Sequence, residues 1–244
     1  MAVVQLFYTC LVDQFSPETA FAVIRVLERL GFDVEVARDQ TCCGQPALNA
    51  GFREPAIAAA RHTISMLESA PGLVVIPSGS CGDMMIHQYE RLFENDAAWR
   101  ARARALASRC REFSSLVADH MGHPPAATTL PETTIAYHPS CHLLRGLGID
   151  AAPKAIIDVL PQARRVAVEA EDECCGFGGL FAIKHPEISA RMLERKIDAI
   201  GRTGADRVVS CDLGCLLQIE GGLHRRNAGI KVQHIAELLD EATR

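Results

Sequence analysis

The sequence has no long apolar run and no block of like charges. Its longest apolar stretches, such as 73–77 and 56–60, are far shorter than the roughly 20 residues that cross a bilayer. The formal charge of -5 comes from 25 basic and 30 acidic residues, which are interspersed, so we expect no nucleic-acid partner. The first ten residues carry neither a basic region nor a small-residue cleavage site. We therefore expect a cytoplasmic protein without a transmembrane segment.

Several common cofactor motifs are absent as well. The chain contains no G-x-G-x-x-G, no G-x-x-x-x-G-K-[ST] and no H-E-x-x-H, so the sequence does not support a dinucleotide-binding, P-loop or zincin function. The ferredoxin run C-x2-C-x2-C-x3-C-P is also missing. Any relay of ferredoxin-type clusters would therefore have to lie in a partner protein.

Cysteine, in contrast, is abundant: the chain has ten. Disulfides do not persist in a reducing compartment, and a chain of 244 residues does not need them to stabilise its core. Clustered thiols in such a chain favour metal ligation or redox chemistry, and buried structural cysteines are the plainer alternative.

The cysteines belong to an internal repeat. In each half, an apolar strand leads to one cysteine, a helix and a second strand lead to Cys-Cys-Gly, and a further helix and strand lead to another cysteine. Cys10 precedes Cys42 by 32 positions, and Cys141 precedes Cys174 by 33. The complete set is Cys10, Cys42, Cys43 and Cys81 in the first half, and Cys141, Cys174, Cys175 and Cys215 in the second.

The last cysteine of the second half could be Cys211 or Cys215. Cys81 follows Val75 by six positions, and Cys215 follows Val209 by six. The repeat therefore selects Cys215, with Cys211 as a possible substitute.

The repeat predicts an α/β fold of two pseudo-symmetric, Rossmann-like halves with mainly parallel sheets. Proline positions and apolar spacing predict helices that begin at Pro17 (capped by Ser16), Pro55, Pro153 and Pro186. The Pro-, Gly- and Thr-rich stretch 119–133 predicts a linker, which places the boundary between domains 1–123 and 124–244. Residues 90–118 are expected to form one inserted long helix. Strands are predicted at 3–8, 34–36, 73–76, 134–137, 166–168 and 207–209.

Each repeat cysteine lies just beyond the carboxyl end of a predicted strand or in the loop that leads into a predicted helix. Ligands bind at this edge of an open α/β sheet. Four thiols in each half are typical of an iron–sulfur cluster, which is anionic and is stabilised by backbone N–H groups. Gly44 and Gly176 would allow the backbone to approach such a group. We expect one 4Fe-4S site, or two.

Zinc is the main alternative metal, because four thiolates also suit a tetrahedral ion. Structural zinc sites usually use C-x2-C pairs, however, whereas adjacent cysteines diverge and suit a larger cluster. A redox-active vicinal disulfide is a third possibility. His138 and His142 flank Cys141 and are candidates for hydrogen bonds that tune a cluster, although capping or packing roles explain them equally well.

These motifs resemble the cysteine-rich CCG domain of three kinds of protein: the CCG-containing subunit of heterodisulfide reductase, the glycolate oxidase iron–sulfur subunit and the lactate utilization protein A family. The length, together with TIAYHPSCHLLRGLG and CCGFGGLFAIKHPEIS, makes the chain most similar to the lactate utilization protein A family. The resemblance implies cluster ligation by the eight repeat cysteines. It also implies an iron–sulfur electron-transfer subunit of a complex that oxidises L-lactate to pyruvate, with a ferredoxin-type subunit and a small third subunit as partners.

Other 2-hydroxy acids remain open as the substrate of such a complex, glycolate among them. Outside the enzymes, a zinc-binding or thiol-switch scaffold is the alternative. The chain also departs from the heterodisulfide reductase pattern, in which a C-x-x-C supplies a fifth ligand. The equivalent positions here are Met84 and Gln218, which argues against disulfide-cleaving chemistry of that type. A heterodisulfide-reductase-like complex nevertheless stays a further alternative among the enzymes.

Overall fold

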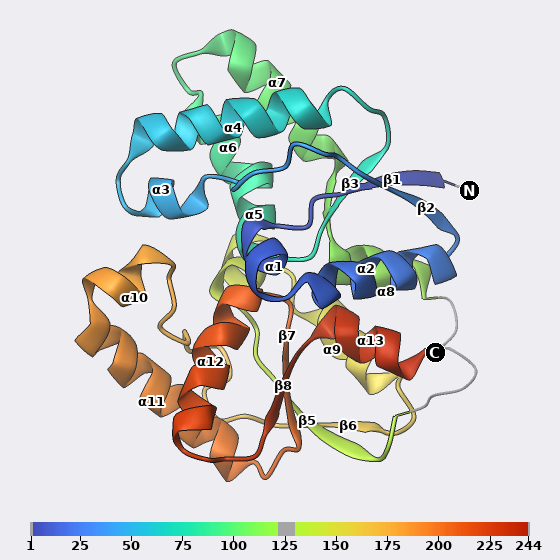
Figure 1. Ribbon diagram of the computed structural model, residues 1–244, viewed down its shortest axis with the longest axis vertical. Coiled ribbons are helices and arrows are strands. Elements are labelled where there is room, and N and C mark those ends of the chain that lie inside the picture. The colour runs from blue at the N-terminus through green and yellow to red at the C-terminus, as the bar shows by residue number, and fades with distance from the viewer. Residues whose placement is uncertain (1, 122–129, 244) are drawn as a thin grey trace.

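The computed structural model describes residues 2–121 and 130–243. These residues form two four-stranded parallel sheets with the strand orders β2-β1-β3-β4 and β6-β5-β7-β8. Figure 1 shows the first half of the chain in the upper part of the molecule and the second half in the lower part. The two sheets have the same order of elements, which confirms the predicted pair of pseudo-symmetric α/β halves.

The first half alternates strands with helices and includes the π-helical turn η1 of residues 84–88. Its strands are β1 (Ala2–Leu6), β2 (Phe32–Val36), β3 (Leu73–Ile76) and β4 (Cys110–Glu112). Its helices before β4 are α1 (Cys10–Phe15), α2 (Pro17–Arg29), α3 (Gln45–Asn49), α4 (Arg53–Leu67), α5 (Gly79–Asp83), α6 (Tyr89–Leu92) and α7 (Ala97–Arg109). Helix α8 (Phe113–His120) follows β4.

The second half repeats this order without a counterpart of α7 among its described residues. Its strands are β5 (Thr133–Tyr137), β6 (Ala163–Val166), β7 (Arg207–Ser210) and β8 (Lys231–His234). Its helices are α9 (Ala151–Asp158), α10 (Leu180–Lys184), α11 (Pro186–Arg202), α12 (Leu213–Arg225) and α13 (Ile235–Ala242), and the π-helical turn η2 covers His142–Gly146.

The central strands follow from runs of β-branched residues that are buried on both faces, as in other parallel sheets. Strand β3 has the sequence LVVI and the predicted bounds. Helices α2 and α11 begin at Pro17 and Pro186, as predicted. Other predicted bounds were wrong by two or three residues. Helices α4 and α9 begin two residues before the predicted prolines, and β6 covers 163–166 rather than 166–168. Strand β1 ends two residues before the predicted position 8, and β2 begins two residues before the predicted position 34.

The prediction of one inserted helix over 90–118 was wrong. This range contains the end of α6, all of α7, strand β4 and part of α8. Cys110 lies on β4, where it pairs with Val74 of β3. The chain leaves the helical conformation because β4 completes the sheet. The predicted boundary after residue 123 lies outside the described residues.

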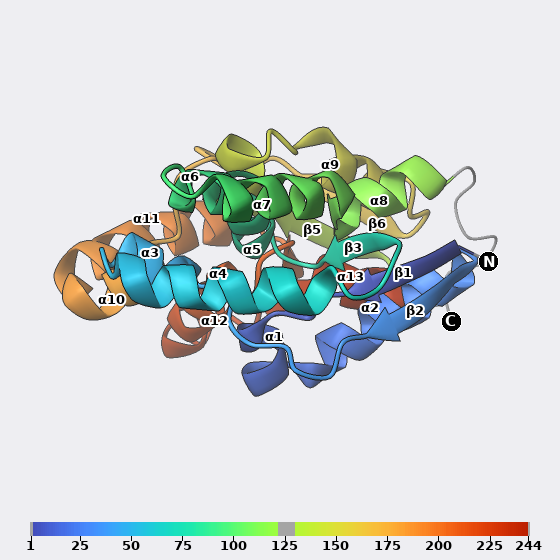
Figure 2. The same ribbon diagram turned by 90° about the horizontal axis from the view of Figure 1, so that it is seen from above.

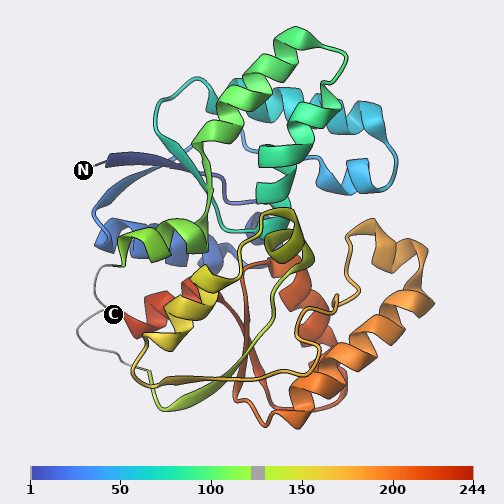
Figure 3. The same cartoon turned by 180° about the vertical axis from the view of Figure 1, so that it is seen from behind.

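The two halves exchange their last helices. Helix α8 follows the fourth strand of the first half and packs against α9 of the second, and α13 follows β8 and packs against α2 of the first (Figure 3). These helices enclose one apolar core that includes residues of both sheets, such as Val4, Val75, Ile135 and Val209. The two halves are therefore joined by shared burial and not only by the chain between them.

Across residues 2–121 and 130–243, the structure contains no helix that combines the length and the apolar character needed to span a bilayer.

Glu112 directly precedes α8 and caps its first turn, and its side chain is buried. Its carboxylate accepts hydrogen bonds from the Ser115 N–H (3.2 Å) and the Ser114 hydroxyl (2.5 Å), and burial raises the pKa of Glu112 from 4.5 to about 7. The folded state therefore binds this proton more tightly than the unfolded state. The contribution of Glu112 to stability falls as pH rises from 4.5 to 7, by about 3 kcal/mol.

We expect Glu112→Gln to remove this contribution, so that the variant gains stability relative to the unaltered chain as pH rises across that window. Urea unfolding at several pH values measures the difference. Parallel pH profiles for the two proteins would show that the carboxyl does not titrate in this range.

Candidate metal centre

The eight repeat cysteines lie beyond the carboxyl ends of the strands, four of them directly after the central strands and four in loops that follow the edge strands β2 and β6. Cys10 starts α1 after β1, and Cys81 lies in α5 after β3. In the second half, Cys141 follows β5 and directly precedes η2, and Cys215 lies in the first turn of α12 after β7. The paired cysteines occupy the loops before α3 and α10. All ten cysteines of the chain are free thiols.

The four thiols of the first half form a connected set. The side chains of Cys10 and Cys43 donate hydrogen bonds to the Cys42 sulfur, and these bonds, with the Gly44 N–H at 3.4 Å, lower the pKa of Cys42 to about 3. The Cys43 thiol also contacts the Cys81 sulfur at 3.3 Å. The arrangement favours a thiolate at its centre, and thiolates are the ligands of iron and zinc.

The second half repeats this arrangement. Hydrogen bonds from Cys141 and Cys175, with the Gly176 N–H at 3.3 Å from the sulfur, lower the pKa of Cys174 to about 2. Cys175 in turn forms a side-chain hydrogen bond with Cys215. The two sets therefore agree in residue type and in the order of their contacts.

Both sets line one cavity of about 380 Å³. Helix α3 of the first half and α10 of the second also contribute to its wall, and they lie near one another in two views (Figures 1 and 2). The local repeat predicted one group of four thiols in each half. The structure adds that both groups open toward the same space.

Gly44 and Gly176 have positive φ angles of 88° and 87°, which favour glycine. A Cβ atom on Gly176 would lie 2.6 Å from the Ser189 carbonyl oxygen, and one on Gly44 would lie 3.2 Å from the Ala56 carbonyl oxygen. These turns direct their N–H groups at the preceding thiolates. They are therefore suited to a bound anionic group.

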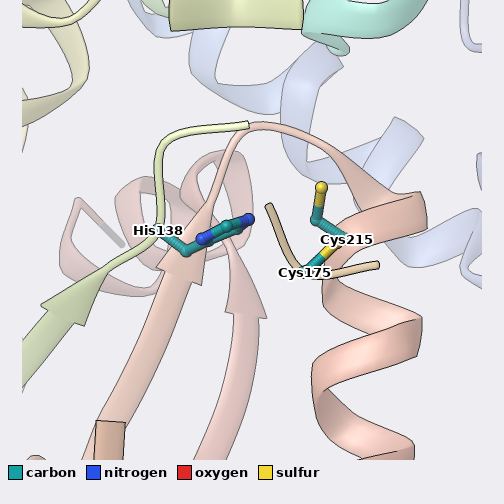
Figure 4. Close-up of side chains that lie close together, drawn as sticks. All are labelled: His138, Cys175 and Cys215. Atoms are coloured by element: carbon teal, nitrogen blue, oxygen red, sulfur yellow. The ribbon is translucent and has the colours of Figure 1, made fainter. Parts of the chain in front are cut away.

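His138 lies beside the second set of thiols and is 2% exposed. One of its ring nitrogens and the sulfurs of Cys175 and Cys215 lie within 4.8 Å of one another (Figure 4). Neither ring nitrogen has a hydrogen-bond partner among the described residues. Burial lowers the pKa of His138 to about 3, which leaves a neutral imidazole with one donor and one acceptor. An unpartnered buried imidazole points to a group that binds here.

His142 has a different role. Its Nδ1 lies 2.9 Å from the Asp83 carboxylate of the first half, and this hydrogen bond raises the pKa of His142. The pair joins η2 to α5 at the edge of the cavity. His142 thus connects the two halves beside both sets of thiols.

Cys211 and Cys110 do not line the cavity in the described part of the chain. Cys211 is fully buried near the Tyr137 hydroxyl, at 4.0 Å, and Cys110 is 1% exposed on β4. The geometry therefore favours Cys215 over Cys211 as the fourth member of the second set.

The donor set fits an iron–sulfur cluster. Each half offers four thiols, and one sulfur in each half accepts a hydrogen bond from a backbone N–H. Both sets line one cavity with largely apolar walls. These features together suit an anionic cluster. The structure thus supports a metal or iron–sulfur cofactor at this position.

Comparison with known proteins agrees with this site. The model of the "Cysteine-rich domain" family named CCG matches residues 4–86 and 135–220, one copy in each half. The chain is 39% identical over 242 residues to "Lactate utilization protein A" of an Exiguobacterium strain, and the match covers 99% of this chain and 98% of the relative. The chain belongs to the lactate utilization protein A family.

Other members of the lactate utilization protein A family match over a similar length. Those of Macrococcus caseolyticus and Bacillus cereus are both 40% identical over 237 residues, or 97% of this chain, and these matches cover 96% and 98% of the two relatives. Among solved structures, a hypothetical protein from Helicobacter pylori is 9% identical with a TM-score of 0.67, over 99% of this chain and 49% of that one. The chain thus spans about half of that protein, and the likeness concerns the fold alone.

Proposed function

We propose that the chain is an iron–sulfur electron-transfer subunit of a cytoplasmic complex that oxidises L-lactate to pyruvate. Each half holds one 4Fe-4S cluster through its four repeat cysteines. The observation that carries the proposal is that two matched sets of four thiols face one cavity. The membership of the lactate utilization protein A family supports lactate as the substrate of the complex.

The chain's own residues provide the surroundings of the clusters. Thiolates bind the iron, the N–H groups of the glycine turns stabilise negative charge, and the burial of Cys43 and Cys175 limits the access of water. A bound cluster would accept and release single electrons. A ferredoxin-type subunit and a small third subunit are the proposed partners, because the chain has no ferredoxin run of its own.

Purification without oxygen, followed by analysis of iron, acid-labile sulfide and zinc, tests the cofactor. We expect about four iron and four sulfide in each half and an electron paramagnetic resonance (EPR) signal after reduction with dithionite. Zinc without sulfide would overturn the proposal and favour a scaffold. That alternative has one specific support, since His138, Cys175 and Cys215 are close enough to share one tetrahedral ion.

The substrate is tested separately, in a bacterium that lacks its own lactate utilization protein A but keeps the other proteins of the complex. We expect this chain to restore growth on L-lactate. Restored growth on glycolate alone would contradict lactate and favour another 2-hydroxy acid, while the cluster assignment would stand.

A further inference from the structure

The surroundings of the two sets of thiols differ at one buried position. His138 and Phe7 occupy equivalent places. The backbone N–H of His138 donates to the Val209 carbonyl oxygen at 2.8 Å, and the backbone N–H of Phe7 donates to the Val75 carbonyl oxygen at 2.9 Å. Both residues directly follow the central strands and are buried. The second half thus has an imidazole where the first half has a hydrocarbon ring.

A second difference lies on helices α4 and α11. The glycine turns place Ala56 and Ser189 at equivalent positions, since the carbonyl oxygens of these residues approach Gly44 and Gly176. Seven positions later, Lys196 is equivalent to Thr63, and both side chains are buried.

Lys196 adds positive charge beside the second set of thiols. Its ammonium group donates to the carbonyl oxygens of Ala170 and Glu171 at 3.1 and 3.0 Å. It interacts electrostatically with Glu173, Cys175, Asp172 and Cys141. The two carboxylates are solvent-exposed, at 45% for Glu173 and 66% for Asp172, so water screens their charge more than that of buried Lys196. Thr63 carries no charge at the equivalent place in the first half.

Asp212 is a buried carboxylate that lines the cavity, and its charge does not distinguish the two halves. One of its oxygens accepts from the Ser80 N–H at 2.9 Å, next to Cys81, and the other accepts from the Gly214 N–H at 3.2 Å, next to Cys215. Its negative charge therefore acts on both sets. The imidazole and the ammonium group act on the second set.

We propose that a ring N–H of His138 donates a hydrogen bond to a sulfur of the second-half cluster, and that this bond and Lys196 make this cluster the more easily reduced of the two. The inference rests on the proposed function, because it requires a cluster in each half.

The chemistry follows from the four thiols already present. Four cysteines satisfy the four irons of a cubane cluster, so the imidazole is not needed as a ligand. A cluster at this place would give the buried ring the partner that it lacks among the described residues. Hydrogen bonds to cluster sulfur and nearby positive charge stabilise the reduced form, which carries one more negative charge. Electrons that enter the chain would therefore reside in the second half.

The test is a redox titration followed by EPR on the anaerobically purified chain. We expect two midpoint potentials. Each is assigned to one half with the variants Cys43→Ser and Cys175→Ser, which remove the cluster of the first and of the second half. His138→Phe, which copies the first half, is expected to shift the second-half potential to a more negative value and leave the first unchanged. The reciprocal Phe7→His is expected to shift the first-half potential to a more positive value. His138→Gln, which keeps an N–H donor, should recover part of the lost shift.

Iron and sulfide content, measured for each variant, separates altered potentials from lost clusters. If His138→Phe loses its cluster, His138→Gln and Phe7→His still test the inference. Unchanged potentials in filled variants, or a first-half cluster that is reduced before the second, would overturn the inference and leave the proposed function intact. An unaltered chain that contains zinc and no sulfide would overturn the proposed function itself.

Discussion

Replacing Cys43 or Cys175 with serine is expected to remove about half of the iron and sulfide from the chain, and replacing both to remove nearly all of it. Each residue is almost fully buried, at 2% and 1% exposure, and each contacts two other thiols of its set. A hydroxyl at this position is a poor ligand for iron, and three cysteines leave one iron without a thiolate. Metal and sulfide analysis of the anaerobic proteins measures the loss.

The two remaining cysteines provide matched controls. Cys110→Ala and Cys211→Ala also alter buried thiols, but neither residue lines the cavity in the described part of the chain. We expect both variants to keep their full iron and sulfide content. If Cys211→Ala lost iron while Cys215→Ala retained it, the assignment of the second set would be wrong.

Gly79→Ala is expected to destabilise the chain by about 2 kcal/mol, because the added methyl group would overpack a rigid contact. A Cβ atom on Gly79 would lie 2.6 Å from the Leu143 Cβ and 2.7 and 2.8 Å from its backbone nitrogen and Cα. These atoms belong to η2 of the other half and cannot move aside as a flexible side chain could. Urea unfolding measures the change, and we expect the variant to lose iron as well, since Cys81 and Cys141 adjoin this contact.

Gly221→Ala is the control, because Gly221 lies inside α12 with no atom near the place of a Cβ. It should gain about 0.5–1 kcal/mol from helix propensity. Equal stability of Gly79→Ala and the unaltered chain would mean that α5 and η2 can separate without cost.

The repeat was sufficient to predict the inner part of each sheet. Strands β1, β3, β5 and β7 are apolar, and each leads to a cysteine at a matched distance, so sequence and structure agree closely there. The strands at one edge of each sheet, β4 and β8, were not predicted, whereas β2 and β6 at the opposite edges were. The sequences of β4 and β8 are CRE and KVQH, which carry no apolar run, and they form because the neighbouring strand offers unpaired backbone groups.

The shared cavity could not be predicted for a related reason. Spacing along the chain places four thiols at one edge of a sheet, but the relative orientation of two sheets depends on which apolar faces meet. Here the exchanged helices α8 and α13 decide it. His138 was predicted beside the site with two interpretations open, and its unpartnered ring nitrogens among the described residues favour contact with a bound group over a capping role.

The exchange of helices also constrains the order of events during synthesis. Helix α2 of the first half packs against α13, which is synthesised only after the strands and the other helices of the second half. One face of α2, although this helix is made early, therefore stays uncovered until the second half has been synthesised. A nascent chain that holds the first half alone would therefore expose apolar residues that the second half covers in the folded protein.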